Sequence, residues 1–238
     1  MFAWQSSGRR RDWSSFEIHY RGGMKMSDKV KSSAEMWDNR FAGEKFAYGK
    51  EPNVWLAERI SEISPPAKNK ALIPADGEGR NAVWCARLGW NAEVFDLSAQ
   101  GKIKCEMLAV EHGVSVDYNV ADLRNLQIPR KQFDLIAFSW FHTPSELRKE
   151  KFPMFITALK KGGHLITEGY HKTQMPLDSG GPKSMDLLWD LDEVLEEFLD
   201  ALPGEVKIEH AAVTSTILDE SDLHTGLARV VRLHLRRI

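Results

Sequence analysis

Short apolar runs alternate with amphipathic segments along most of the chain. Runs with few polar residues are typical of parallel strands that are buried on both faces. They lie at 71–74, 92–95, 114–120, 133–140 and 164–168. Segments with helical apolar spacing follow them, at 80–88, 99–112 and 144–159. This alternation of strands and helices predicts an α/β fold.

The flanking segments complete the predicted architecture. A helix over 54–60 precedes the first strand, and another over 188–198 follows the fifth. Two strand-like runs, 206–214 and 226–235, end the chain. We expect a Rossmann-like, seven-stranded, mostly parallel sheet with helices on both faces and an antiparallel last strand. In the helix over 99–112, the spacing of Ile103, Met107 and Val110 predicts that these three residues face inward.

The first 34 residues lack an apolar period of either kind. We expect an N-terminal extension over 1–34, disordered or outside the native protein, and one folded domain over 35–238. Met24 and Met26 are alternative starts. The basic run Arg9-Arg10-Arg11 also permits a nucleic-acid arm, which is the less favoured interpretation.

Bulk composition narrows the possible partners. A chain of 238 residues suits one sizeable core, and its net charge of -2 gives no general attraction to nucleic acid. Cys85 and Cys105 fall in predicted helices and form no metal-type cluster. No apolar run has membrane-spanning length. We therefore expect a cytoplasmic monomer or homodimer with no metal, nucleic-acid or membrane partner.

The turn after the first strand is the first candidate site. The strand ends at Pro74, and Gly77 and Gly79 follow. Glycine permits a tight turn and a close approach of the backbone to a ligand. Free amides at the start of the next helix favour polar or anionic groups. Ligands of open α/β sheets bind at this carboxyl edge.

Two aspartates follow later strands. Asp96 lies about 20 residues after the turn, at the spacing of an acidic residue that accepts hydrogen bonds from ribose. A helix N-cap, or a partner of Ser98, is the less favoured alternative. Asp122 follows the third strand and fits either an adenine contact, with the backbone of Leu123, or the start of a turn. Those two interpretations of Asp122 stay open.

The glycine turn by itself fits two cofactors. Residues 77–82 match the dinucleotide pattern G-x-G-x-x-A, which would indicate a nicotinamide-dependent oxidoreductase. They also resemble the first motif of class I S-adenosylmethionine-dependent methyltransferases. An aromatic-rich segment before the first strand favours the methyltransferase, because a dinucleotide-binding domain begins near that strand.

More of the chain resembles one branch of these methyltransferases, the tellurite-resistance branch beside the thiopurine methyltransferases. The similar segments are Trp37-Asp38-x-Arg40-Phe41, Tyr48-Gly49-x-Glu51-Pro52-Asn53, residues 77–84, Ala121-Asp122-Leu123, Leu159-Lys160-x-Gly162-Gly163 and Gly180-Gly181-Pro182. The resemblance runs from about Glu35 to the C-terminus. It implies methyl transfer from S-adenosylmethionine and suggests tellurite as one acceptor.

The resemblance also implies roles for single residues. Gly77 and Gly79 would line the methionine part of the cofactor, and Arg40 and Tyr48 would lie near its carboxylate. Residues 139–142 would form the wall beside the sulfonium. The expected cofactor-binding residues are Arg40, Tyr48, Asp76, Gly77, Gly79, Asp96, Leu97, Asp122, Leu123 and Ser139.

The strand before the turn departs from the usual motif. An acidic residue is usual at the position of Ile73, and a glycine at that of Ala75. Our hypothesis is that the carboxylate of Asp76 takes over the ammonium group of the cofactor. The alternative for Asp76 is a surface turn residue.

No residue identifies itself as a general base. Displacement at a sulfonium methyl group mainly needs alignment and the exclusion of water, and a soft or anionic acceptor needs no base. The weak candidates at strand ends are His142, Glu168, Tyr170 and His171; we expect each to pack or hydrogen-bond instead. The loop over 172–184 is a candidate substrate lid. A small-molecule methyltransferase is favoured over the oxidoreductase and over a non-catalytic binder.

Overall fold

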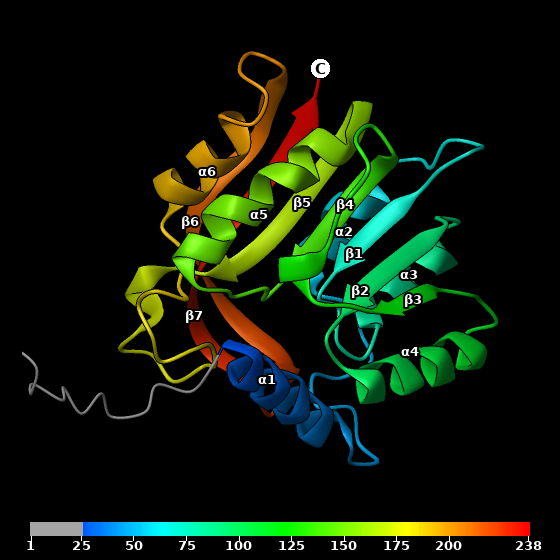
Figure 1. The fold of residues 1–238 in the computed structure, drawn as a ribbon, viewed down its shortest axis with the longest axis vertical. Coiled ribbons are helices and arrows are strands. Elements are labelled where there is room, and N and C mark those ends of the chain that lie inside the picture. Colours follow the sequence, from blue (N-terminus) through cyan, green and yellow to red (C-terminus); the bar gives the residue numbers. More distant parts are fainter. Residues whose placement is uncertain (1–25) are drawn as a thin grey trace, which may run out of the picture.

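The computed structural model describes residues 26–238, and their side chains from Ser33 on. Seven strands form one sheet in the order β3-β2-β1-β4-β5-β7-β6 (Figure 1). The strands are β1 Ala71–Pro74, β2 Ala92–Asp96, β3 Asp117–Val120, β4 Phe133–Ser139, β5 Leu159–Tyr170, β6 Val206–Ser221 and β7 His224–Arg237. The helices are α1 Met26–Phe41, α2 Val54–Ser61, α3 Arg80–Arg87, α4 Ala99–Glu111, α5 Ser145–Ala158 and α6 Leu191–Leu199.

Strand direction confirms the predicted sheet. Strands β1 to β5 pair in parallel, whereas β7 runs antiparallel to both β5 and β6. An antiparallel strand between β5 and β6 is not part of the dinucleotide-binding order 3-2-1-4-5-6. The topology therefore favours the methyltransferase plan.

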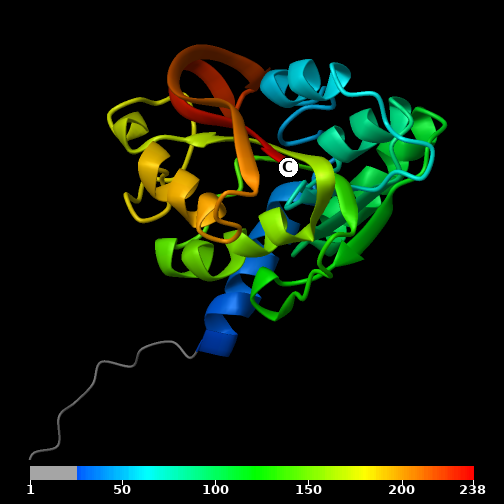
Figure 2. The same cartoon turned by 90° about the horizontal axis from the view of Figure 1, so that it is seen from above.

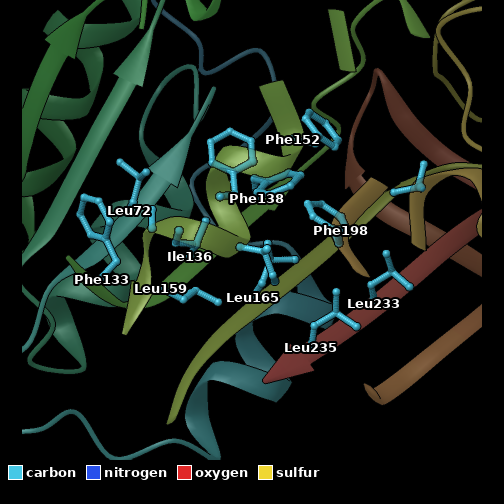
Figure 3. Packing of buried hydrophobic residues seen from close by; sticks show 14 of the residues in the cluster. Leu72, Phe133, Ile136, Phe138, Phe152, Leu159, Leu165, Phe198, Leu233 and Leu235 are labelled. Atoms are coloured by element: carbon cyan, nitrogen blue, oxygen red, sulfur yellow. The ribbon is translucent and has the colours of Figure 1, made fainter. Parts of the chain in front are cut away.

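Two apolar clusters bury the two faces of the sheet, and Figure 2 shows helices on both sides of it. Successive residues of a strand point to opposite faces, so Ile136 and Phe138 enter one cluster and Leu135 and Ala137 the other. Helices α5 and α6 cover the first cluster, which Figure 3 shows with Phe152 of α5. Helices α2, α3 and α4 supply the second.

Helix α4 packs with a different face from the predicted one. Ile103, Met107 and Val110 are 49%, 61% and 79% exposed, so their inward prediction is wrong. The buried face instead carries Lys104 and Cys105. Cys105 packs on the glycine turn so closely that a Cβ on Gly79 would lie 2.2 Å from its Sγ. This close packing and an ion pair of Lys104 set the rotation of the helix.

Near both ends of the chain, the bounds of the observed elements differ from the predicted ones. Helix α1 begins at Met26, so it crosses the expected boundary between residues 34 and 35; polar residues dominate its first turns and hide a helical period. The basic run 9–11 lies outside the described residues. The hairpin of β6 and β7 reaches further than predicted, to a tip at 222–223. None of the helices from Met26 onward is long and apolar enough to cross a membrane.

Candidate functional site

The glycine turn lies beside the end of β2, as the sequence predicts. The amide of Ala75 donates to the carbonyl of Phe95 at 2.8 Å, and that of Gly77 donates to Asp96 Oδ2 at 3.0 Å. Gly77 has a φ of 55°, and a Cβ there would lie 2.9 Å from the ring of Phe41. The C-terminal end of α1 therefore covers the turn.

Asp96 is the last residue of β2, and Asp122 follows the neighbouring strand β3 at the same edge. The backbone of Ala121 donates to the carbonyl of Asp96 at 2.8 Å. Burial raises the pKa of Asp96 although its carboxylate accepts from the amides of Ser98 and Gly77. Leu97, which follows Asp96, is half-buried. The structure thus brings together the residues expected at a nucleoside, and their binding roles stay predictions.

Asp122 begins a turn, which is one of its two open interpretations. Its Oδ1 accepts from the backbone of Arg124 at 2.9 Å, and the Arg124 guanidinium pairs with the carboxylate. Partial burial acts to raise the pKa of Asp122, but these hydrogen bonds outweigh it and hold the pKa below its usual value. The side chain of Leu123 is buried in the apolar cluster of α5, and its carbonyl accepts from the amide of Leu126 at 3.2 Å. A contact of its amide with adenine stays a prediction.

Asp76 caps the start of α3. Its Oδ1 accepts from Asn81 Nδ2 at 2.7 Å and its Oδ2 from the amide of Ala82 at 2.8 Å. Burial raises the pKa of Asp76 to about 7, against these hydrogen bonds. Asp76 is half-buried and hydrogen-bonded to the first turn of α3, so it is more than a surface turn residue. Its contact with the cofactor ammonium group stays a hypothesis.

Ala75 has a left-handed backbone, with a φ of 52°. This conformation costs a non-glycine residue about 1–2 kcal/mol. We expect Ala75→Gly to raise the free energy of unfolding by about 0.5–1 kcal/mol, because the strain removed exceeds the added entropy of the unfolded chain. Urea unfolding measures the change. A loss of stability in this variant would show that Ala75 is not strained.

Arg40 and Tyr48 meet near the turn. Arg40 Nη1 donates to the hydroxyl of Tyr48 at 2.9 Å, and the guanidinium lies over the ring of Trp37. Burial raises the pKa of Tyr48, and Arg40 opposes that effect. The structure therefore gathers both residues beside the motif, and their contact with the cofactor carboxylate stays a prediction.

His142 is held by backbone groups at both ring nitrogens. Its Nδ1 lies 2.8 Å from the carbonyl of Leu187, which can only accept, and its Nε2 accepts from the amide of Tyr170 at 3.2 Å. The imidazole is thus neutral, and burial lowers the pKa of His142 to about 4. His142 can accept a proton at Nε2 only if the hydrogen bond from the Tyr170 amide breaks. These contacts favour a structural role for His142.

This lowered pKa predicts a pH dependence of stability. The unfolded chain protonates His142 near pH 6.5 and the folded chain only near pH 4, so the residue destabilises the fold as the pH falls through that window. We expect His142→Gln to lose less stability than the wild type between pH 6.5 and 4. Denaturant unfolding across this range measures the difference. Equal slopes would contradict the prediction.

The other candidates at the strand ends are also engaged. The Tyr170 hydroxyl donates to the carbonyl of Ser179 at 3.2 Å, and burial raises the pKa of Tyr170. His171 caps a short 3-10 turn through Thr173. Ser139 is buried at the end of β4, where Asn81 Nδ2 lies 3.4 Å from its hydroxyl. None of these contacts identifies a base.

Sequence reasoning missed a buried carboxylate, Glu220, at the tip of the β6–β7 hairpin. Its Oε2 accepts from Arg80 Nη2 at 2.7 Å and from the indole of Trp140 at 3.0 Å, and it lies 3.3 Å from His224 Nδ1. Its Oε1 accepts from Asn53 Nδ2 at 2.8 Å. The same amide of Asn53 donates to Glu168. The only signal was a Glu-x-x-x-His spacing in an expected loop.

The sequence analysis also assigned no role to Glu78 and Arg80, the two charged residues of the glycine motif at 77–82. Glu78 pairs with Lys104 at 2.8 Å, and Arg80 pairs with Glu220; all four side chains are less than 10% exposed. Glu78 also accepts from the amide of Tyr48. The glycine turn therefore connects α4, the segment before α2 and the hairpin tip.

Comparisons with known proteins agree with this geometry. Residues 73–163 match the model of a methyltransferase domain, and no curated protein matches the sequence. A structure described for the conversion of a disulfide bond into a thioacetal group during echinomycin biosynthesis is 17% identical, covering 86% of this chain and 91% of that one, with a TM-score of 0.63.

Two further structures share the fold at 14% identity and a TM-score of 0.56. The match to TehB from Haemophilus influenzae covers 86% of this chain and 67% of TehB. The match to magnesium protoporphyrin IX methyltransferase from Synechocystis PCC 6803, solved with bound SAH, covers 91% of this chain and 89% of that protein. The match over 73–163 thus indicates a methyltransferase domain, and the solved structures share its fold.

Proposed function

We propose that the chain transfers the methyl group of S-adenosylmethionine to a small molecule. We infer a small acceptor because three segments of the chain pack over the carboxyl edge of the sheet. Phe41 packs on Gly77, and the backbone at Gly180 approaches the Tyr170 hydroxyl, where a Cβ would lie only 2.6 Å away. The hairpin tip is tied to Arg80 from a third side. A site covered by three elements favours a small acceptor over a polymer.

The residues at this edge fit the cofactor. Asp96 and Asp122, on adjacent strand ends, would hold the ribose and the adenine, because carboxylates accept from hydroxyl and amino groups. Arg40 and Tyr48 would hold the methionine carboxylate by charge and hydrogen bonding. When bound, the cofactor supplies a methyl group that the sulfonium already activates.

The acceptor side favours a nucleophile that needs little help from a base. His142, Tyr170 and His171 each have a structural partner. An oxyanion such as tellurite, or a thiolate, attacks without losing a proton. The resemblance of the sequence from about Glu35 onward to the tellurite-resistance branch also directs attention to tellurite. For a thiol or an amine, His224 would serve as the proton acceptor, because no described side chain hydrogen-bonds to its Nε2.

Binding and turnover test this proposal separately. We expect calorimetry to detect binding of both S-adenosylmethionine and S-adenosylhomocysteine, with a rise in Tm that NAD does not produce. Radiolabelled methyl transfer to tellurite, small thiols and small amines should then identify the acceptor class. Binding without transfer to any of these acceptors would indicate a non-catalytic binder. Absence of binding would overturn the proposal.

A further inference from the structure

The carboxylate of Glu220 is surrounded by donors. Its side chain is 5% exposed, and its four partners come from four separate parts of the fold: Asn53 before α2, Arg80 of α3, Trp140 after β4 and His224 of β7. Three of these partners, Asn53, Arg80 and Trp140, donate whatever the tautomer of His224. Because the Arg80 guanidinium also lies 2.7 Å from Oε2, the carboxyl group is in its ionised form.

Ionisation of Glu220 decides the tautomer of His224. A carboxylate only accepts, so the ring nitrogen at 3.3 Å, Nδ1, carries the hydrogen. In the neutral imidazole, Nε2 is then an unprotonated acceptor. Among the described residues, none hydrogen-bonds to this Nε2. His142 offers the contrast, because the Tyr170 amide occupies its Nε2.

The surroundings place His224 on the acceptor side of the site. Its ring centroid lies 4.8 Å from that of Tyr48, 5.0 Å from Trp140 and 5.8 Å from Tyr170. Trp140 directly follows β4, Tyr170 is the last residue of β5, and Tyr48 approaches from the covering segment. Trp140 has a left-handed backbone with a φ of 58°, a strain that buried contacts must hold in place.

We propose that Glu220 is a positioning residue that holds His224 as the Nδ1–H tautomer and so presents a free Nε2 to the acceptor. The inference rests on the proposed methyl transfer for its use, and on the hydrogen bonds alone for the tautomer. The ion pair of Glu220 with Arg80 adds a condition: the arrangement exists only while the hairpin tip is docked on the glycine turn.

Several titratable and charged groups face His224 from the elements around it. They are Arg40 of α1, Tyr48, Arg80 of α3, His142 after β4, Tyr170 of β5 and Glu220 of β6. Burial lowers the pKa of His224, and Glu220 opposes that effect. A neutral residue at position 220 therefore lowers the pKa of His224 further.

Nitrogen-15 NMR of the full chain with labelled histidine tests the tautomer directly. The His224 signals are assigned by their loss in His224→Gln. At pH 8 we expect the wild type to show a protonated Nδ1 and an unprotonated Nε2. Glu220→Ala should lose this pattern, whereas Glu220→Gln should keep it, because the amide oxygen still accepts from Nδ1. A wild-type His224 protonated at Nε2 would overturn the proposal.

If Glu220→Ala fails to fold, an NMR titration of His224 in Glu220→Gln still tests the proposal. In Glu220→Gln we expect the pKa of His224 to fall by about one unit, because the opposite charge is lost. Asp219→Asn, an exposed neighbour on the same strand, is the control and should leave the His224 signals unchanged. An unchanged pKa in Glu220→Gln would contradict the proposal.

The proposed methyl transfer can fail independently of this result. The NMR measurements contain neither cofactor nor acceptor, so they report on Glu220 even if calorimetry finds no binding of S-adenosylhomocysteine. Once an acceptor that must lose a proton is known, Glu220→Gln should lower kcat more than it raises KM. The acidic limb of its pH profile should also move to lower pH. An acidic limb that stays in place would contradict the positioning role.

Discussion

Replacing Lys104 with methionine is expected to lower the free energy of unfolding by about 3–5 kcal/mol. The Lys104 ammonium lies 2.8 Å from Glu78, and the two side chains are 8% and 3% exposed. Methionine keeps an apolar stem of similar length beside Phe46 but removes the positive charge, so the Glu78 carboxylate would stay buried beside the glycine turn without its cationic partner. Such an uncompensated charge is costly, whereas the intact pair itself contributes little net stability.

Two further variants distinguish the loss of the buried ion pair from a general effect of replacing lysine with methionine in helix α4. Lys102 sits on the same helix in an exposed pair with Glu106, so Lys102→Met should cost less than about 1 kcal/mol. The double variant Lys104→Met with Glu78→Gln should recover part of the loss, because it removes the stranded charge. Urea unfolding of the three variants gives these values. Equal losses in Lys102→Met and Lys104→Met would show that the pair is not buried in solution.

The prediction of the sheet from the sequence succeeded because its signals are local. Strands β1, β2 and β4 are short apolar runs bounded by turns, and each begins within a residue of its expected start. The positions of Gly77 and Asp96 beside each other follow from strand order and spacing alone. Local patterns therefore determine the architecture and the edge of the sheet at which the candidate site lies.

The rotation of α4 was wrong because its cause is not local. Ile103, Met107 and Val110 form a convincing apolar stripe, yet Lys104 faces inward to a partner 26 residues away in sequence. A hydrophobic pattern treats a lysine as exposed and cannot find the carboxylate that permits its burial. The packing of Cys105 on Gly79 acts in the same direction.

Glu220 escaped prediction for a related reason. Its donors come from positions 53, 80, 140 and 224, and only the closed sheet brings them together. The expected strands also stopped at 214 and resumed at 226, which placed the residue in a loop. Buried polar groups are satisfied across the whole fold. Their partners follow from the topology and not from any single segment.

The second large effect is expected at Asp96. If its carboxylate accepts hydrogen bonds from the ribose hydroxyls, Asp96→Asn should weaken binding of S-adenosylhomocysteine by about 10- to 100-fold, because a hydrogen bond to a charged group contributes about 1.5–3 kcal/mol. Asparagine keeps the size of the side chain and one acceptor oxygen. Since Asp96 also accepts from the amides of Gly77 and Ser98, alanine would disturb the turn itself. Calorimetry at constant pH measures the affinity.

The control for Asp96 must separate a ribose contact from general loss of charge. Asp117 lies at the opposite end of the neighbouring strand β3 and is exposed, so Asp117→Asn should leave the affinity unchanged. Asp122→Asn should have a smaller effect than Asp96→Asn, because Arg124 already occupies its carboxylate. Near-UV circular dichroism checks that the turn stays intact in each variant. If Asp96→Asn binds as tightly as the wild type, the ribose is held elsewhere, and the nucleoside pocket at the ends of β2 and β3 must be abandoned.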